Sequence, residues 1–123
     1  MNLRDIVRRV AGSTWLRVLA LGCLVAIVFL SLAPKTLEGV GESLPHGSIQ
    51  HFAAYLVTAG LFGLAARQRR NPAGLIVMFV AFAGLMEVLQ QWSPGRSPEV
   101  EGFVASSLGA AAGAFVAYAV RPA

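Results

Sequence analysis

Residues 87–101 read Glu-Val-Leu-Gln-Gln-Trp-Ser-Pro-Gly-Arg-Ser-Pro-Glu-Val-Glu, a polar stretch that interrupts a long apolar background. Glu87 lies inside a hydrophobic segment, where a carboxylate is costly unless another group pairs with it. Gln90 and Gln91 follow at the i+3 and i+4 spacings and therefore share its helix face. The Pro94-Gly95 pair ends the helix, because proline cannot continue the hydrogen-bond ladder and glycine tolerates a sharp turn. The stretch thus predicts an apolar helix that carries polar groups close to its end.

The composition of the 123-residue chain indicates a membrane protein. Hydrophobic residues make up 56% of it and charged residues only 13%, whereas a soluble domain carries about 25% charged residues. The mean hydropathy of +0.66 and the 13 glycines agree with this, since glycine is more frequent in membrane helices than in soluble ones. The length limits the chain to one domain. We therefore expect an all-α, polytopic membrane protein with a single membrane domain.

Four apolar runs are each long enough to cross roughly 30 Å of hydrocarbon as a helix. They cover residues 15–32, 49–66, 73–92 and 100–120 and predict a four-helix bundle. The basic segment 1–14 has apolar residues at roughly helical spacing, typical of a small amphipathic helix on a membrane surface. A basic segment before an apolar run also describes a signal peptide. The length of the run and the lack of a small-x-small cleavage site favour a retained helix.

The basic residues predict the orientation of the bundle. Eight of them fall on one side of the predicted membrane: Arg4, Arg8, Arg9, Arg17, Arg67, Arg69, Arg70 and Arg121. Only Lys35 and Arg96 fall on the other side. The positive-inside rule then places both termini and the turn 67–72 in the cytoplasm. The connections 33–48 and 93–99 are expected to face outward.

This topology brings the polar candidates to the outer face of the bundle. His51 and Tyr55 share a helix face near the outer end of the second span, and Glu87 lies roughly 7–8 Å below the outer end of the third, at 1.5 Å per residue. The other candidates are Gln90, Gln91, Arg96, Glu99, Glu101 and Ser106. The planar guanidinium of Arg96 suits a carboxylate or a phosphate. Two interpretations remain open: a structural Glu87–Arg96 ion pair, and an outward pocket for an anionic or polar headgroup.

Other chemistries have little support in the sequence. Glu99 and Glu101 stand near the start of the fourth span, where a negative charge favours the helix dipole by about 0.3–1 kcal/mol. A metal site formed by His51, Glu87 and Glu99 has no supporting spacing, and no catalytic triad or phosphate loop is visible. The single cysteine, Cys23, excludes an internal disulfide and a multi-cysteine metal site. Basic residues do not cluster with aromatics on a solvated face, as in nucleic-acid binders. We expect no metal, no cofactor and no nucleic-acid partner.

The fourth span carries a row of small residues on one face. Gly102, Ser106, Gly109 and Gly113 step along it by four, three and four. Small residues at this spacing let helix backbones approach closely in lipid. The motif Gly109-x-x-x-Gly113 alone is weak, but the longer row favours packing within the chain over self-dimerisation.

The residues collected above resemble the VanZ-like family of small membrane proteins, over the part of the chain from His51 to about Gly113. The matching pieces are His51-Phe52-x-x-Tyr55, Glu87-x-x-Gln90, Pro94-Gly95-Arg96-Ser97 and Gly109-x-x-x-Gly113. The family usually carries an Asp about six residues after the Arg and an Asn four residues further on. This chain has Gly102 and Ser106 at those positions. An activity that depends on the Asp and the Asn would be lost or altered here.

The resemblance implies a bacterial inner-membrane location and a role in the cell envelope. The family is named for a protein linked to low-level resistance to a glycopeptide antibiotic of the teicoplanin type, and most members have no assigned reaction. We expect a non-enzymatic protein whose outer polar residues bind a lipid headgroup, a wall precursor or a partner membrane protein. One alternative is a membrane enzyme acting on such a headgroup, with His51 or Glu87 as acid or base. The other is an accessory subunit whose polar residues only hold the helices together.

Overall fold

Five α-helices form the computed structural model over the residues that it describes, which are 1–32, 47–67, 71–92 and 100–122. They are α1 (Leu3–Val10), α2 (Thr14–Leu32), α3 (Gly47–Ala65), α4 (Pro72–Gln90) and α5 (Val100–Val120). The last four are long and apolar enough to cross a membrane. The predictions of an all-helical chain and of four apolar spans are therefore confirmed. The expected connection 93–99 and residues 33–46 of the expected connection 33–48 lie outside the described residues, whereas residues 47 and 48 belong to α3.

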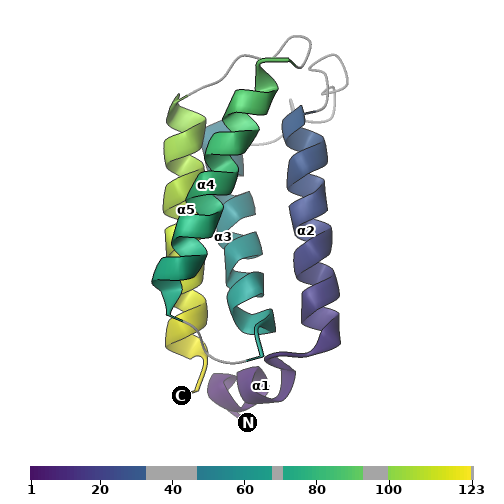
Figure 1. Ribbon diagram of the computed structural model, residues 1–123. Coiled ribbons are helices and arrows are strands. Elements are labelled where there is room, and N and C mark those ends of the chain that lie inside the picture. Colours follow the sequence, from purple (N-terminus) through teal and green to yellow (C-terminus); the bar gives the residue numbers. More distant parts are fainter. Residues whose placement is uncertain (33–46, 68–70, 93–99, 123) are drawn as a thin grey trace.

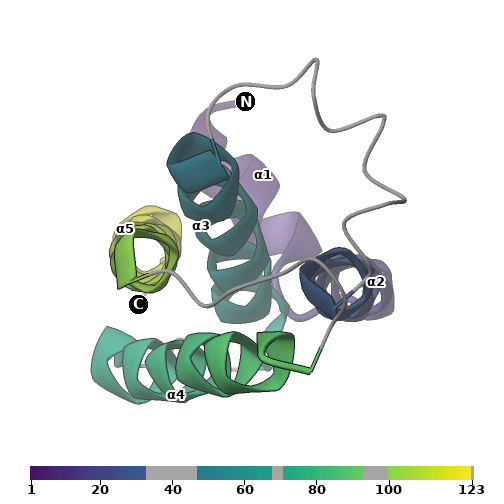
Figure 2. The same cartoon turned by 90° about the horizontal axis from the view of Figure 1, so that it is seen from above.

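The four long helices run alongside one another in an up-and-down bundle (Figure 1). Viewed along the bundle, α3 lies between α2 and α5, and α4 lies beside α5 and α2 (Figure 2). The closest packing is between α3 and α5, while α4 packs mainly on α5 and α2 mainly on α3. Helix α2 is the most peripheral span, since Ala20 and Ile27 are its only buried residues. The most closely packed part of the bundle is therefore formed by α3, α4 and α5.

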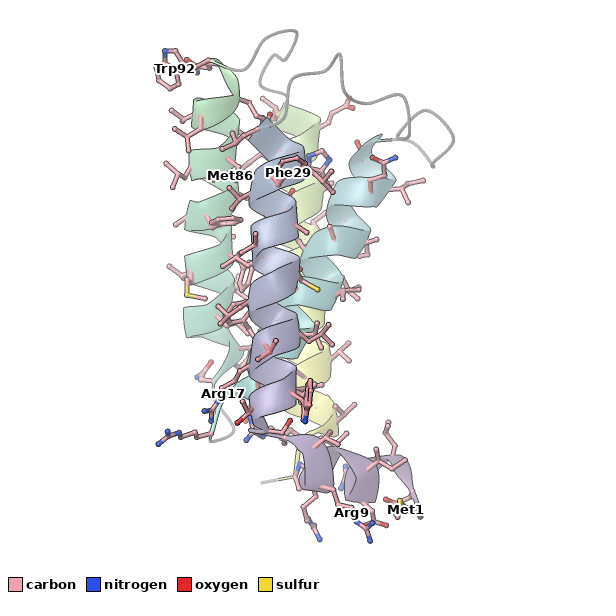
Figure 3. All side chains as sticks on the ribbon, turned by 90° about the vertical axis from the view of Figure 1, so that its right-hand side faces the viewer. Met1, Arg9, Arg17, Phe29, Met86 and Trp92 are labelled. Carbon is pink, nitrogen blue, oxygen red and sulfur yellow. The ribbon has the colours of Figure 1, made fainter. Side chains whose placement is uncertain are left out.

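The bundle has two chemically different ends. At one, which we call the polar end, α2 and α4 finish and α3 and α5 begin (Figure 1). At the other, which we call the basic end, lie both termini, α1 and the last turn of α3 (Figure 1). Figure 3 shows Trp92 at the polar end and Arg9 and Arg17 at the basic end. An indole at one end and guanidinium groups at the other are typical of the two interfaces of a membrane span.

Local sequence signals begin two of the helices. The Asn2 side chain accepts a hydrogen bond from the Asp5 backbone N–H (3.0 Å), and the Asp5 carboxylate accepts one from the Asn2 N–H (3.3 Å). This reciprocal capping box starts α1. The side-chain Oδ1 of Asn71 accepts a hydrogen bond from the Ala73 backbone N–H (2.9 Å), and Pro72 occupies the first turn of α4. Proline fits there because the first helical N–H groups have no partner within the helix.

Helix α1 lies across the basic end of the bundle rather than along it (Figure 1). Its Val7 is buried, while Leu3, Ile6 and Val10 are exposed. Arg8 and Arg9 occupy the last turn. An exposed apolar stripe beside basic residues suits a short helix that lies in a membrane interface.

The core between the spans is built from aromatic and small side chains. Phe79 of α4 is only 1% exposed and contacts rings on α3 edge to face. Its ring centroid lies 5.5 Å from that of Phe62 and 6.2 Å from that of Tyr55. Ala59 and Ala110 are fully buried beside this group. Small residues let the rings fit between closely spaced backbones, which matters in lipid because dispersion contacts replace the hydrophobic drive.

The glycines of α5 bring its backbone against that of α3. A Cβ atom added at Gly113 would overlap the Leu56 carbonyl oxygen and lie 2.9 Å from the Gly60 nitrogen. One added at Gly109 would overlap the Phe52 carbonyl oxygen and lie 3.0 Å from its Cα. The small-residue row of α5 thus packs within the chain, and it fixes the register between α3 and α5.

Candidate functional site

Three helices bring polar side chains together at the polar end of the bundle. A Cβ atom added at Gly102 of α5 would lie 3.3 Å from Oε1 of Glu87 on α4 and 3.6 Å from Nε2 of His51 on α3. The carboxylate and the imidazole therefore approach the same point on the α5 backbone. Gly102 itself is buried. The absence of a side chain at position 102 is what allows both groups to approach so closely.

A second pair of polar groups lies one turn deeper in the bundle. The Tyr55 phenol and the Ser106 hydroxyl are hydrogen-bonded, and Glu87 acts on the phenol electrostatically. Tyr55 is 3% exposed and Ser106 is 2% exposed. We call His51, Tyr55, Glu87 and Ser106 the polar cluster. Its members come from three long, mostly apolar helices.

The spacing of these residues explains why they meet. His51 and Tyr55 are four residues apart on α3, and Gly102 and Ser106 are four residues apart on α5, so each pair occupies one helix face. Helices α3 and α5 both run from the polar end towards the basic end (Figure 1). His51 therefore lies opposite Gly102, and Tyr55 lies opposite Ser106. Glu87 completes the cluster because α4 runs in the opposite direction and ends at the same place.

The other predicted site residues divide into three groups. Gln90 is buried at the last residue of α4. Gln91 and Glu101 are exposed, so the structure places them on the outside of the bundle rather than within the cluster. Arg96 and Glu99 lie outside the described residues.

Two of the sequence-based alternatives involve residues outside the described ranges. These are the Glu87–Arg96 ion pair and the metal site formed by His51, Glu87 and Glu99. Within residues 1–32, 47–67, 71–92 and 100–122, no group of three or more His, Cys, Asp or Glu side chains is placed to hold a metal ion. His51 and Glu87 each take part in an interaction in the structure.

A second polar arrangement, at the basic end, was not predicted. The Arg121 Nη1 donates to the carbonyl oxygens of Gly63 (2.9 Å) and Leu64 (3.5 Å) in the last turn of α3. The Gly12 backbone N–H also donates to the Leu64 oxygen, at 2.8 Å. Gly12 has a φ of 75°, a left-handed conformation that favours glycine. The chain between α1 and α2 and the end of α5 thus both close the C-terminus of α3.

Arg17 of α2 contributes to the same arrangement. Its Nε donates to the Ala65 carbonyl oxygen (3.3 Å) and its Nη2 to the Gly12 carbonyl oxygen (3.1 Å). The last four carbonyl groups of a helix have no partner within the helix, and in lipid an unsatisfied group costs several kcal/mol. One sequence feature indicates this arrangement, because Arg17 lies inside an apolar run and such a charge needs a partner. An arginine near the end of a span commonly extends towards the lipid headgroups, but these two donors of Arg17 bond to the protein instead.

These features define the class of the molecule: the chain is a polytopic membrane protein with four apolar candidate spans, a polar cluster at one end and a basic opposite end. No family model, curated protein or solved structure matches the chain. The resemblance to the VanZ-like family consequently rests on the four short motifs and stays a prediction.

Proposed function

We propose that the protein is a VanZ-like, non-enzymatic protein of the bacterial inner membrane that binds a polar headgroup of an envelope lipid or wall precursor at its polar cluster. The observation that carries the proposal is the approach of Glu87 and His51, from two helices, to Gly102 on a third. An ionisable group within a membrane span is costly and commonly marks a functional site. The Glu87 carboxylate is joined at the same end by the polar side chains of His51, Tyr55 and Ser106, which is a stronger indication than a single group.

The chemistry of the cluster suits a headgroup rich in hydroxyl, amine or phosphate groups. A carboxylate accepts hydrogen bonds, whereas an imidazole, a phenol and a hydroxyl both donate and accept them. We assign Arg96, in the connection between α4 and α5, to the anionic part of the headgroup, because its fork of N–H donors matches phosphate or carboxylate. Gly102 and Ser106 stand where the resembled family has Asp and Asn. Gly102 faces His51 and Glu87, and Ser106 faces Tyr55.

The second candidate is a purely structural role, favoured by the hydrogen bond between Tyr55 and Ser106. In it the cluster only holds α3, α4 and α5 together. Side-chain hydrogen bonds between membrane helices stabilise a bundle by about 0.6 kcal/mol on average. The backbone contacts at Gly109 and Gly113 already fix α3 against α5. A costly carboxylate would add little stability to helices that are already held together in this way. We therefore favour headgroup binding as the role of the polar cluster.

The substitution Glu87→Gln tests the proposal. We expect the variant to insert into the membrane at the wild-type level. The amount of polar lipid or precursor that copurifies with it in mild detergent should fall at least tenfold. The reason is that an amide keeps the shape of the carboxylate but removes its charge. Bound lipids are identified by mass spectrometry after incubation of the purified protein with a total membrane lipid extract.

Glu101→Gln is the matched control, because it makes the same charge change at an exposed position one residue from Gly102. It should leave lipid retention unchanged. Equal retention by both variants would contradict the binding role. Loss of the Glu87→Gln protein from the membrane would instead support the structural role. A changed headgroup composition in cells that express the wild-type protein would support the enzymatic alternative.

The proposed orientation, with the polar end outside and both termini in the cytoplasm, has a separate test. In a Cys23→Ala background, the exposed positions 101 and 67 report the polar and the basic end. We expect an impermeant maleimide added to intact spheroplasts to label Glu101→Cys, and to label Arg67→Cys only after lysis. The physical basis is the excess of arginine at the basic end, which the positive-inside rule keeps in the cytoplasm. The reverse labelling pattern would refute this orientation.

A further inference from the structure

A groove of about 770 Å³ opens between α2, α3 and α4 at the basic end of the bundle, away from the polar cluster. Its apolar walls include Leu21 of α2, Phe62 of α3 and Leu75 and Met78 of α4. Arg17 also lines it. The groove exists because α2 packs mainly on α3 and only sparsely on α4.

We propose that this groove binds an anionic phospholipid, with one acyl chain between α2 and α4 and the phosphate at Arg17. The proposal is independent of the function assigned to the polar cluster. It commits to a lipid because the groove is apolar along the spans and positively charged at the end where the headgroups of a bilayer would lie.

The polarity of the groove follows the axis of the bundle. Its polar lining residues, Arg17 and Asn71, belong to the start of α2 and the residue before α4, both at the basic end. From Pro72 to Met78 the α4 wall is apolar, and these two residues are six steps apart, a rise of about 9 Å at 1.5 Å per residue. Leu21 and Met78 are 54% and 49% exposed, so the apolar part is open to the surrounding lipid. A phospholipid has the same order of polar and apolar parts.

Arg17 has donors left for a phosphate. Its guanidinium has five N–H donors, and its bonds to Ala65 and Gly12 use one on Nε and one on Nη2. These bonds fix the guanidinium beside the groove. A planar, prepositioned guanidinium suits bidentate contact with a phosphate.

The surroundings of the groove complement a negative headgroup. The basic end carries Arg4, Arg8, Arg9, Arg67 and Arg121. Asp5 is the single acidic residue at this end within the described ranges. Basic pockets between membrane helices are a known recognition mode for anionic lipid headgroups.

The chain offers a matched pair of variants for the test. Gly74 lines the groove and Gly22 lies on the exposed surface of α2, and a Cβ atom at either position meets no atom within 4 Å. The substitution Gly74→Phe therefore adds a bulky side chain at the wall of the groove, from a Cβ position that meets no other atom, and Gly22→Phe adds the same side chain elsewhere. The readout is native mass spectrometry of the full-length protein with phosphatidylglycerol or phosphatidylcholine of identical chains.

We expect the wild type and Gly22→Phe to retain phosphatidylglycerol at least tenfold better than phosphatidylcholine, and Gly74→Phe to retain neither. Arg17→Lys should keep the preference, and Arg17→Gln should abolish it. The proposal would be overturned if Gly74→Phe and Gly22→Phe retained phosphatidylglycerol equally. It would also be overturned if the wild type retained phosphatidylglycerol and phosphatidylcholine equally. A third contrary result is a wild-type dimer that becomes a monomer in Gly74→Phe while lipid retention stays the same. The groove would then hold a second copy of the chain and not a lipid. If Arg17→Gln does not fold, the glycine pair still decides.

Discussion

Gly113→Ala is expected to lower the free energy of unfolding by about 3 kcal/mol, the upper end of the usual range for overpacking. The added methyl group would overlap the Leu56 carbonyl oxygen and lie 2.9 Å from the Gly60 nitrogen. Both obstacles are backbone atoms of α3, so no side-chain rotation relieves the clash. The two helices must separate, and the dispersion contacts along their interface weaken with distance. Unfolding in mixed detergent micelles, followed by circular dichroism, measures the change.

Gly22→Ala is the control for this prediction. A Cβ atom there meets no neighbouring atom within 4 Å, so the substitution changes only helix propensity and is expected to be neutral or to stabilise by up to about 1 kcal/mol. Gly109→Ala should behave like Gly113→Ala, because its Cβ atom would overlap the Phe52 carbonyl oxygen. If all three variants were equally stable, α3 and α5 would not be packed as closely as the structure shows.

The number and type of the helices could be predicted because the bilayer limits the possibilities. A span needs about 20 apolar residues, and the backbone must satisfy its hydrogen bonds internally. The chain shows four runs of this kind, and the structure has four apolar helices there. Asn71 and Pro72 also mark the start of α4 as their chemistry suggests.

The meeting of the polar residues was partly predictable. Alternating spans necessarily bring His51, Glu87 and Ser106 to one end, and the structure does bring them together with Tyr55. Gln91, which was expected to share the face of Glu87, is exposed in the structure. Helix α4 ends at Gln90, and the Gln91 N–H bonds to the Val88 carbonyl oxygen at 3.2 Å, three residues back. This tighter last turn accompanies the exposure of Gln91.

The packing partners of each span could not be predicted. A helix that is apolar around its whole circumference has no polar face to indicate which side is buried. The loose packing of α2, the groove beside it and the convergence of Arg17 and Arg121 on α3 all depend on that missing information. The row from Gly102 to Gly113 was the exception, because small residues on one face mark where another backbone approaches.

Arg121→Ala is expected to destabilise the bundle by about 1.5–3 kcal/mol, the range for hydrogen bonds to a charged group. Arg121 is only 8% exposed, and its guanidinium donates to the Gly63 and Leu64 carbonyl oxygens. Without it, the Gly63 oxygen loses a charge-assisted bond at the negative end of the α3 dipole. The same micelle unfolding experiment measures the loss.

Two further variants separate this capping role from general charge effects. Arg67→Ala removes an exposed arginine just beyond the end of α3, and surface substitutions of this kind usually change stability by less than about 0.5 kcal/mol. Arg121→Lys keeps the charge but loses the planar fork, so its stability should fall between those of the wild type and Arg121→Ala. Equal stability of Arg121→Ala and Arg67→Ala would show that the α3 carbonyls find other partners. A lysine variant as unstable as the alanine variant would show that the geometry of the guanidinium, rather than its charge, closes α3.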